Sequence, residues 1–164
     1  MSKLYSIDRL EQIIHSEKKE NRNIVLANGC FDLIHVGHIR CLKEAKKEGD
    51  ILVVALNSDA SVRRLKGPGR PILDEDERSE ILSAFTFVDY VTIFEEDTVN
   101  KILLTLKPDV HAKGSDYTKE TVPERNTVLG YGGRIAITGG PKLRSTSDLF
   151  QEIARKVKGS NKLG

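Results

Sequence analysis

The chain has 164 residues, a length typical of one domain. Hydrophobic residues make up 38% and charged residues 30% of it, a balance that excludes intrinsic disorder. The net charge is only +2, so the composition argues against a protein that coats nucleic acid. Two cysteines are too few to staple such a domain, charges from Lys3 onward interrupt any signal peptide, and no apolar run approaches the roughly 20 residues of a membrane helix. We therefore expect a cytoplasmic globular domain that neither spans a membrane nor binds nucleic acid.

The first predicted element is an amphipathic helix. Apolar residues from Ile7 to Ile14 repeat at helical spacing, and a charged run over residues 17–20 follows them. We expect this helix to belong to an N-terminal arm, residues 1–22, that packs outside the main fold.

A strand, a loop and a helix come next. Residues 24–27 form a short β-branched and apolar run that ends at the turn pair Asn28-Gly29, and a helical pattern extends over residues 36–48. Residues 51–56 form a continuous apolar run, which is typical of a parallel strand buried on both faces. These segments predict a βαβ unit.

The alternation continues to the end of the chain. Asp74 with Glu77 three residues later predicts a capped helix start. Strands are predicted at 88–94, 110–113 and 134–138, helices at 59–65, 98–106 and 145–158, and a glycine- and proline-rich loop at 66–71. This order predicts the α/β class, with a doubly wound parallel sheet and a ligand site beyond the carboxyl ends of its strands. We expect the domain to span residues 23–158 and residues 159–164 to form a frayed tail.

Two histidines, His35 and His38, stand at the start of the second predicted helix. A helix N-terminus has unpaired N–H groups and a positive dipole end, so a phosphate can bind there. Histidines three positions apart lie on one helical face and can donate hydrogen bonds to the same anion. Two alternatives remain at this point: half of a zinc site, which Cys30 and Cys41 are poorly spaced to complete, or surface residues with no role.

Several segments resemble the HxGH nucleotidylyltransferases. Asn28-Gly-Cys-Phe-Asp-Leu-Ile-His-Val-Gly-His38 is similar to the first motif of that family, Asn57-Ser-Asp59 to the end of its second strand, and Arg144-Ser-Thr-Ser147 to its motif at the closing helix. The segments 66–71 and 113–117 make the chain most similar to the bacterial D-glycero-β-D-manno-heptose 1-phosphate adenylyltransferases, which occur alone or fused to a kinase. Ser115 and His111 depart from the usual pattern of these relatives.

The resemblance implies a Rossmann-like fold and a reaction that joins a nucleoside triphosphate to a phosphorylated acceptor and releases pyrophosphate. ATP, accompanied by Mg²⁺, and a sugar phosphate are the implied partners, no residue of the chain is expected to ligate a metal, and a homodimer is one option. By resemblance, the catalytic residues are His35, His38 and Arg78. The nucleotide-binding residues are Cys30, Phe31, Lys113, Gly114, Asp116, Arg144, Ser145, Thr146 and Ser147. The acceptor-binding residues are Asp59, Arg63, Lys66 and Arg70.

In such a reaction the two histidines stabilise the charge that grows on the leaving oxygen. The acceptor phosphate is already an anion at neutral pH, so alignment and charge neutralisation are the work left for the protein. Two other classes of function stay open: nucleotidyl transfer to glycerol 3-phosphate or to a flavin nucleotide, and nucleotide sensing without turnover.

Overall fold

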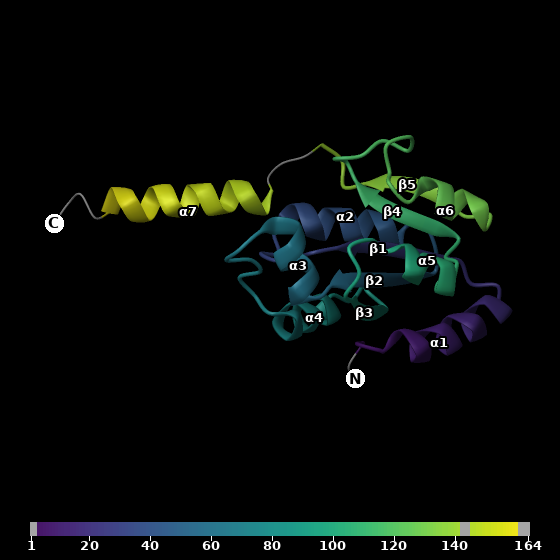
Figure 1. Ribbon diagram of the computed structural model, residues 1–164. Helices are drawn as coiled ribbons and strands as arrows, with labels where there is room; N and C mark the ends of the chain where they lie inside the picture. Colours follow the sequence, from purple (N-terminus) through teal and green to yellow (C-terminus); the bar gives the residue numbers. More distant parts are fainter. Residues whose placement is uncertain (1–2, 142–144, 161–164) are drawn as a thin grey trace.

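The computed structural model describes residues 3–141 and 145–160, and Figure 1 shows a parallel sheet with helices on both faces. The sheet has five strands in the order β3-β2-β1-β4-β5, and every neighbouring pair is parallel. The strands are β1 (Ile24–Gly29), β2 (Ile51–Asn57), β3 (Tyr90–Phe94), β4 (Val110–Gly114) and β5 (Arg134–Thr138). The predicted fold class is confirmed. All seven residues of β2 are buried, as its continuous apolar run predicts.

Two buried clusters cover the two faces of the sheet. On one face, Leu42 and Leu82 belong to the cluster that also holds Val25 and Val54. On the other, Ile14 and Leu103 belong to the cluster that holds Leu26.

The helices are α1 (Ile7–Lys19), α2 (Val36–Lys46), α3 (Asp59–Lys66), α4 (Glu75–Ala84), α5 (Asn100–Leu106), α6 (Arg125–Gly130) and α7 (Thr146–Ser160). Within the described ranges, none of these helices has the length and apolar character needed to cross a membrane.

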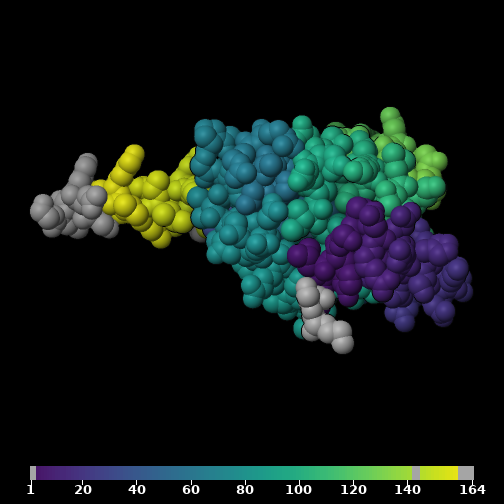
Figure 2. Space-filling view, turned by 60° about the horizontal axis from the view of Figure 1, so that its bottom comes forward, coloured from purple at the N-terminus to yellow at the C-terminus, as the bar shows by residue number. Residues whose placement is uncertain are grey.

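The N-terminal helix α1 is part of the domain rather than an arm outside it. Leu10 and Ile14 are 0% and 1% exposed and belong to the core cluster. The chain before α1 lies beside β3, because Tyr5 N donates to Val91 O at 2.9 Å. Figure 2 shows α1, in purple, lying directly against the body of the protein. Burial of each of these two side chains stabilises the fold by roughly 1.5–3 kcal/mol, so the apolar face of α1 packs against the sheet.

The C-terminal half contains two departures from the sequence prediction. The short helix α6 was not predicted, because its six residues show no apolar periodicity. Helix α7 forms as predicted, but it projects away from the sheet instead of closing the domain (Figures 1 and 2). Its apolar residues Ile153 and Val157 are 53% and 57% exposed. Most of the predicted tail, residues 159–164, lies outside the described residues.

The strand order reverses direction at β1. The chain moves from β1 outward to β2 and β3, and then returns to the other side of β1 for β4 and β5. At such a switch point the two following loops diverge, which leaves a crevice beyond the carboxyl ends of β1 and β4.

Candidate active site

A cavity of about 570 Å³ occupies this crevice. Its wall includes the turn after β1, the start of α2, the loop after α3, the β3–α5 loop, the loop after β4 and the start of α7. Of the predicted site residues, the structure brings to this wall Cys30, Phe31, His35, His38, Lys66, Arg70, Lys113, Gly114, Asp116, Ser145, Thr146 and Ser147. The turn after β1 and the start of α2 belong to one connection, so five connections of the chain meet at this cavity.

His35 and His38 are held in defined tautomers by the backbone of α2. His35 Nδ1 accepts from Gly37 N at 3.1 Å, and His38 Nδ1 accepts from His35 N at 3.4 Å, so the pair forms a capping box. The rings stack with centroids 3.9 Å apart. Because each Nδ1 accepts a hydrogen bond, each neutral ring carries its proton on Nε2. The site therefore has two Nε2–H donors at the N-terminus of one helix.

Both imidazoles are neutral at pH 7. Burial lowers the pKa of His35, while the nearby Asp148 opposes that shift. Burial, with a smaller effect of the neighbouring His35, lowers the pKa of His38 to about 4. These rings are hydrogen-bond donors and not cations at neutral pH.

The turn after β1 presses an aromatic ring against His38. Phe31 has a φ of 44°, in the left-handed region that non-glycine residues seldom adopt, so its backbone stores strain. Its ring is 8% exposed and lies edge-on to the His38 ring, with centroids 5.3 Å apart. Phe31 thus restricts the orientation of His38.

Asp32 ties this turn to the loop that follows α3. Its two carboxylate oxygens accept from Arg70 Nε at 2.6 Å, Ile72 N at 2.7 Å and Leu73 N at 3.2 Å. The Arg70 guanidinium also lies over the Phe150 ring of α7, 4.4 Å from its centroid. Arg70 therefore reaches the cavity, but Asp32 balances its charge. Lys66 lines the cavity from the end of α3.

The catalytic role predicted for Arg78 does not fit its position. Arg78 is 0% exposed and does not line the cavity. Its guanidinium donates to three carbonyls, Leu73 O at 3.0 Å, Cys30 O at 2.6 Å and Asn57 O at 2.8 Å, and to the Asp59 carboxylate at 2.7 Å. These bonds leave the guanidinium no surface that faces a phosphate. Arg78 joins the exits of β1 and β2 to the loop before α4, so it is a positioning residue.

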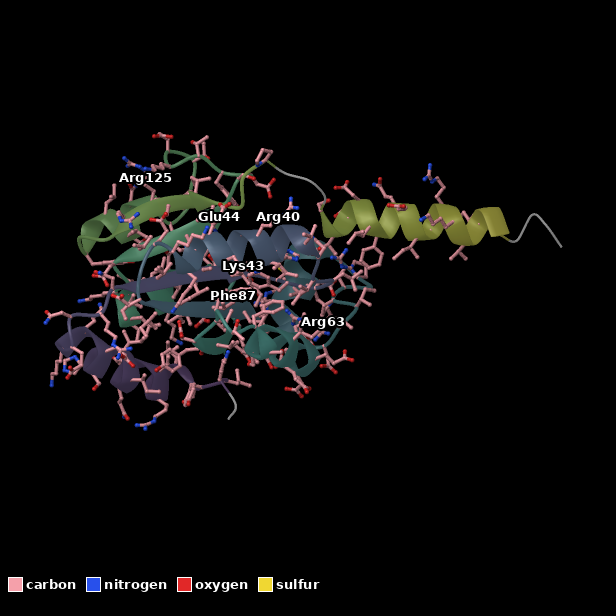
Figure 3. All side chains as sticks on the ribbon, turned by 180° about the vertical axis from the view of Figure 1, so that it is seen from behind. Arg40, Lys43, Glu44, Arg63, Phe87 and Arg125 are labelled. Atoms are coloured by element: carbon pink, nitrogen blue, oxygen red, sulfur yellow. The ribbon has the colours of Figure 1, made fainter. Side chains whose placement is uncertain are left out.

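Two predicted acceptor-binding residues are also placed elsewhere. The Asp59 carboxylate is bound to Arg78, and Asp59 does not line the cavity. Arg63 is exposed on α3 (Figure 3) and does not line the cavity either. Asp59 instead faces Arg78 at the exits of β1 and β2, and Arg63 faces solvent, which the sequence pattern alone did not show.

Ser145, Thr146 and Ser147 line the cavity from the start of α7. Asp148 Oδ2 accepts from Ser145 N at 2.6 Å and from Ser145 Oγ at 2.7 Å, so a carboxylate holds the donors that an anion would use. Arg144 lies outside the described residues. The exit of β5 is drawn to α2 because Glu44, labelled in Figure 3, accepts from Gly139 N at 2.5 Å. That contact fixes the exit of β5 against α2.

A buried polar group lies on the other side of β1. Asn28 Oδ1 accepts from Lys113 Nζ at 3.3 Å and lies 3.0 Å from His111 Nε2. Lys113 Nζ is also 3.5 Å from Glu124 Oε2. Lys113, Glu124 and His111 are 8%, 5% and 0% exposed. Glu124 was not among the predicted site residues, since it stands in an aperiodic loop with no motif around it.

We expect His111 to make folding stability depend on pH. Burial, assisted by the charge of Lys113, lowers the pKa of His111 from 6.5 to about 3. The unfolded chain therefore binds more protons between these values, so stability falls as the pH falls through this window. Lowering the pH from about 7.5 to about 5 should remove about 2 kcal/mol of unfolding free energy through His111 alone. His111→Gln, which keeps a donor for Asn28 but does not titrate, should lose that part of the decrease.

Urea denaturation of both proteins at the two pH values measures this effect. Equal losses of unfolding free energy in wild type and His111→Gln would contradict the prediction. His38→Gln is a second comparison: burial also lowers the pKa of His38, to about 4, so this variant should lose less unfolding free energy than wild type as the pH falls from 6.5 to about 4.

The described residues contain no group of three His, Cys, Asp or Glu side chains arranged to hold a metal ion. Asp32, the carboxylate next to the histidines, is 2% exposed and its oxygens already accept from Arg70 and two backbone N–H groups. These residues do not fit a protein-held cation. The zinc alternative raised by the two histidines also lacks further ligands here.

Comparison with known proteins identifies the family. The sequence profile described as Cytidylyltransferase-like matches residues 26–141. The Bifunctional protein HldE of Geobacter metallireducens is 50% identical over 94% of this chain, and that of Gluconobacter oxydans is 42% identical over 90% of it. The chain covers only 31% of each of these relatives, so it spans about a third of their length.

Solved structures agree with the fold. A lipopolysaccharide core biosynthesis protein from Thermoplasma volcanium shares 32% identity and a TM-score of 0.64, with coverage of 74% of this chain and 99% of that one. Pantoate-beta-alanine ligase from Francisella tularensis, at 17% identity and a TM-score of 0.63, is similar in fold alone. The family match covers the five strands, apart from the first two residues of β1, and all of the cavity-lining residues except those at the start of α7. The chain therefore belongs to the cytidylyltransferase-like family of nucleotidyltransferases.

Proposed function

We propose that the protein transfers the AMP group of ATP to a sugar 1-phosphate, D-glycero-β-D-manno-heptose 1-phosphate, and releases pyrophosphate. The observation that carries this proposal is the pair of Nε2–H donors of His35 and His38, fixed by backbone hydrogen bonds inside the cavity. Donors that need no reorientation are effective at stabilising charge that develops during a reaction.

The reaction assigned to this geometry is a single displacement. An oxygen of the acceptor phosphate attacks the α-phosphorus of ATP, and the bond from that phosphorus to the bridging oxygen breaks. The electron pair of the broken bond stays on the departing pyrophosphate, where the two Nε2–H groups and the N-terminus of α2 meet the growing charge. No proton transfer is needed, because the attacking phosphate is already an anion.

The sugar acceptor rests on resemblance. The segments 66–71 and 113–117 resemble those of heptose 1-phosphate adenylyltransferases, and the related Thermoplasma volcanium structure carries the name of a lipopolysaccharide core biosynthesis protein. We further propose that Mg²⁺ enters with ATP as its complex, bound by phosphate oxygens and water. The same proposal places the reaction in the cytoplasm, where ATP is supplied. A homodimer stays a prediction.

Pyrophosphate release tests the proposal. ATP, CTP, GTP and UTP are each incubated with heptose 1-phosphate, other sugar 1-phosphates, glycerol 3-phosphate and FMN. We expect ATP with heptose 1-phosphate to give the highest kcat/KM, above GTP by at least about tenfold, since a pocket built for adenine leaves buried groups unpaired against guanine.

His38→Ala is the control for a contaminating activity, because it removes one of the two donors. A higher kcat/KM for CTP with glycerol 3-phosphate would replace the adenylyl assignment. Tight ATP binding with no pyrophosphate released from any acceptor would favour the nucleotide sensor.

A further inference from the structure

The cavity lies beyond the carboxyl ends of the strands and is lined by residues from both faces of the sheet. In β1, Leu26 belongs to the cluster beneath α1 and α5, and side chains two positions apart point to the same face. Asn28 therefore projects toward that face, and so does Lys113, which stands two positions after the register partner of Leu26. The helix α2 with its two histidines covers the opposite face. The cavity thus has a histidine side and, across the exit of β1, a side lined by Thr98, Lys113 and Glu124.

In-line displacement assigns different ligands to the two sides. The attacking and leaving oxygens lie on opposite sides of the α-phosphorus. If pyrophosphate leaves toward His35 and His38, the acceptor approaches from the side away from them. That side is the part of the cavity that Lys113 and Glu124 line.

Glu124 places a buried carboxylate in the wall of the cavity. It is 5% exposed, and among the described residues its charged partner is Lys113, with Nζ 3.5 Å from Oε2. Across the described residues, no donor makes a hydrogen bond to Oε2. Although it is the N-cap residue of α6, its side chain makes no capping bond. A buried carboxylate oxygen that meets only an ammonium at 3.5 Å and accepts no hydrogen bond is costly, and such groups in native proteins call for an explanation.

We propose that the Glu124 carboxylate accepts hydrogen bonds from hydroxyl groups of the acceptor and selects for a polyhydroxylated sugar phosphate. This inference rests on the proposed function and names a residue that reads the acceptor.

The chemistry of the pair favours hydroxyls over other ligand groups. A carboxylate only accepts hydrogen bonds and repels phosphate, so its ligand must supply donors, and the donors of a sugar phosphate are its hydroxyls. Lys113, 8% exposed, balances the charge of Glu124 and is itself held by Asn28 and by the Tyr117 ring, 4.9 Å from Nζ. A site built to bond a hydroxyl rejects an analogue that lacks it, because the carboxylate is then left unpaired.

The test compares Glu124→Gln with wild type on D-glycero-β-D-manno-heptose 1-phosphate and a series of its monodeoxy analogues, with pyrophosphate as readout. We expect the KM for heptose 1-phosphate to rise by at least about tenfold, as for one lost charge-assisted hydrogen bond, while the Kd for ATP from calorimetry changes less than about twofold. Wild type should lose at least about tenfold in kcat/KM with one monodeoxy acceptor, and Glu124→Gln should lose much less with that acceptor.

Glu120→Gln is the matched control, since Glu120 lies on the same loop but is exposed and does not line the cavity. Glu124→Asp should recover part of the acceptor affinity. Thermal melting reports whether the variants fold, and the wild-type analogue series tests the proposal without any substitution.

Three results would overturn the inference while the proposed function stands: an unchanged acceptor KM in folded Glu124→Gln, equal use of all monodeoxy acceptors by wild type, or lost discrimination between ATP and 2′-deoxy-ATP instead of between acceptors. The last result would assign Glu124 to the ribose. If wild type released no pyrophosphate with any sugar phosphate, the proposed function and this inference would both be wrong.

Discussion

Replacing His38 by alanine should lower kcat by about 10²–10³-fold, because it removes a fixed donor to the leaving oxygen. The hydrogen bond from Nε2 strengthens only as that oxygen gains charge, so the effect falls on turnover more than on ground-state binding. The Kd for ATP should therefore change much less than kcat. Steady-state pyrophosphate release and calorimetric titration of ATP measure the two quantities separately.

His35 requires a different substitution, because its Nδ1 also caps α2. Alanine would remove that cap at a cost of about 1 kcal/mol in stability, which would confuse the comparison. Asparagine keeps a capping acceptor but withdraws the Nε2–H donor, so His35→Asn should lose turnover with little change in melting temperature. His15, exposed on α1, gives the control His15→Ala, which should change neither quantity. A folded His38→Ala with wild-type kcat would remove this histidine from the mechanism.

Replacing Arg78 by methionine should destabilise the fold by about 3–5 kcal/mol, the range seen when one partner of a buried ion pair is removed. The substitution leaves three carbonyls and the Asp59 carboxylate without their donor. Lysine should not rescue the protein, because one ammonium cannot reproduce the planar set of donors of a guanidinium. Urea denaturation gives the loss in unfolding free energy.

Arg63→Met is the matched control, since this arginine is exposed on α3 and should shift stability by no more than about 0.5 kcal/mol. In wild type, Arg78 holds the carbonyl of Cys30. The turnover of Arg78→Met should therefore decrease for two reasons: a smaller fraction of the protein is folded, and the turn at Cys30 is less ordered. If Arg78→Met instead melted like wild type and lost only turnover, Arg78 would contact substrate directly.

Arg78 and Asp32 have complementary effects on the geometry of the site. Arg78 holds the carbonyl of Cys30, and Asp32, two residues later, holds the backbone of the loop before α4. The turn that presents Phe31 to His38 is thus held on both sides by buried charged groups. Such preorganisation keeps the donors of the two histidines in position before substrate binds.

The amino-acid sequence by itself determined the strands, most helices and the parallel sheet, because apolar periodicity is a local property and burial of each run follows from it. Asp74 and Glu77 form the predicted capping box, since their partners lie within one helical turn. The placement of His35 and His38 at a helix start within the cavity was predicted for the same reason, as the motif and the helix are contiguous.

The tertiary structure alone decided which charged residues face the cavity. The bonding partners of Arg78 include Cys30, 48 positions away, and Asn57, 21 positions away, so no local pattern could separate a phosphate ligand from a buried positioning residue. Glu124 reaches the wall only because α6 packs near the end of β4, where Lys113 meets it. The apolar face of α1 packs into the core, whereas the apolar residues of α7 stay exposed. The sequence shows that both helices have an apolar face, but it does not show what each face packs against. Local patterns specify elements, whereas contacts between distant segments, which depend on the whole fold, specify the chemistry of the site.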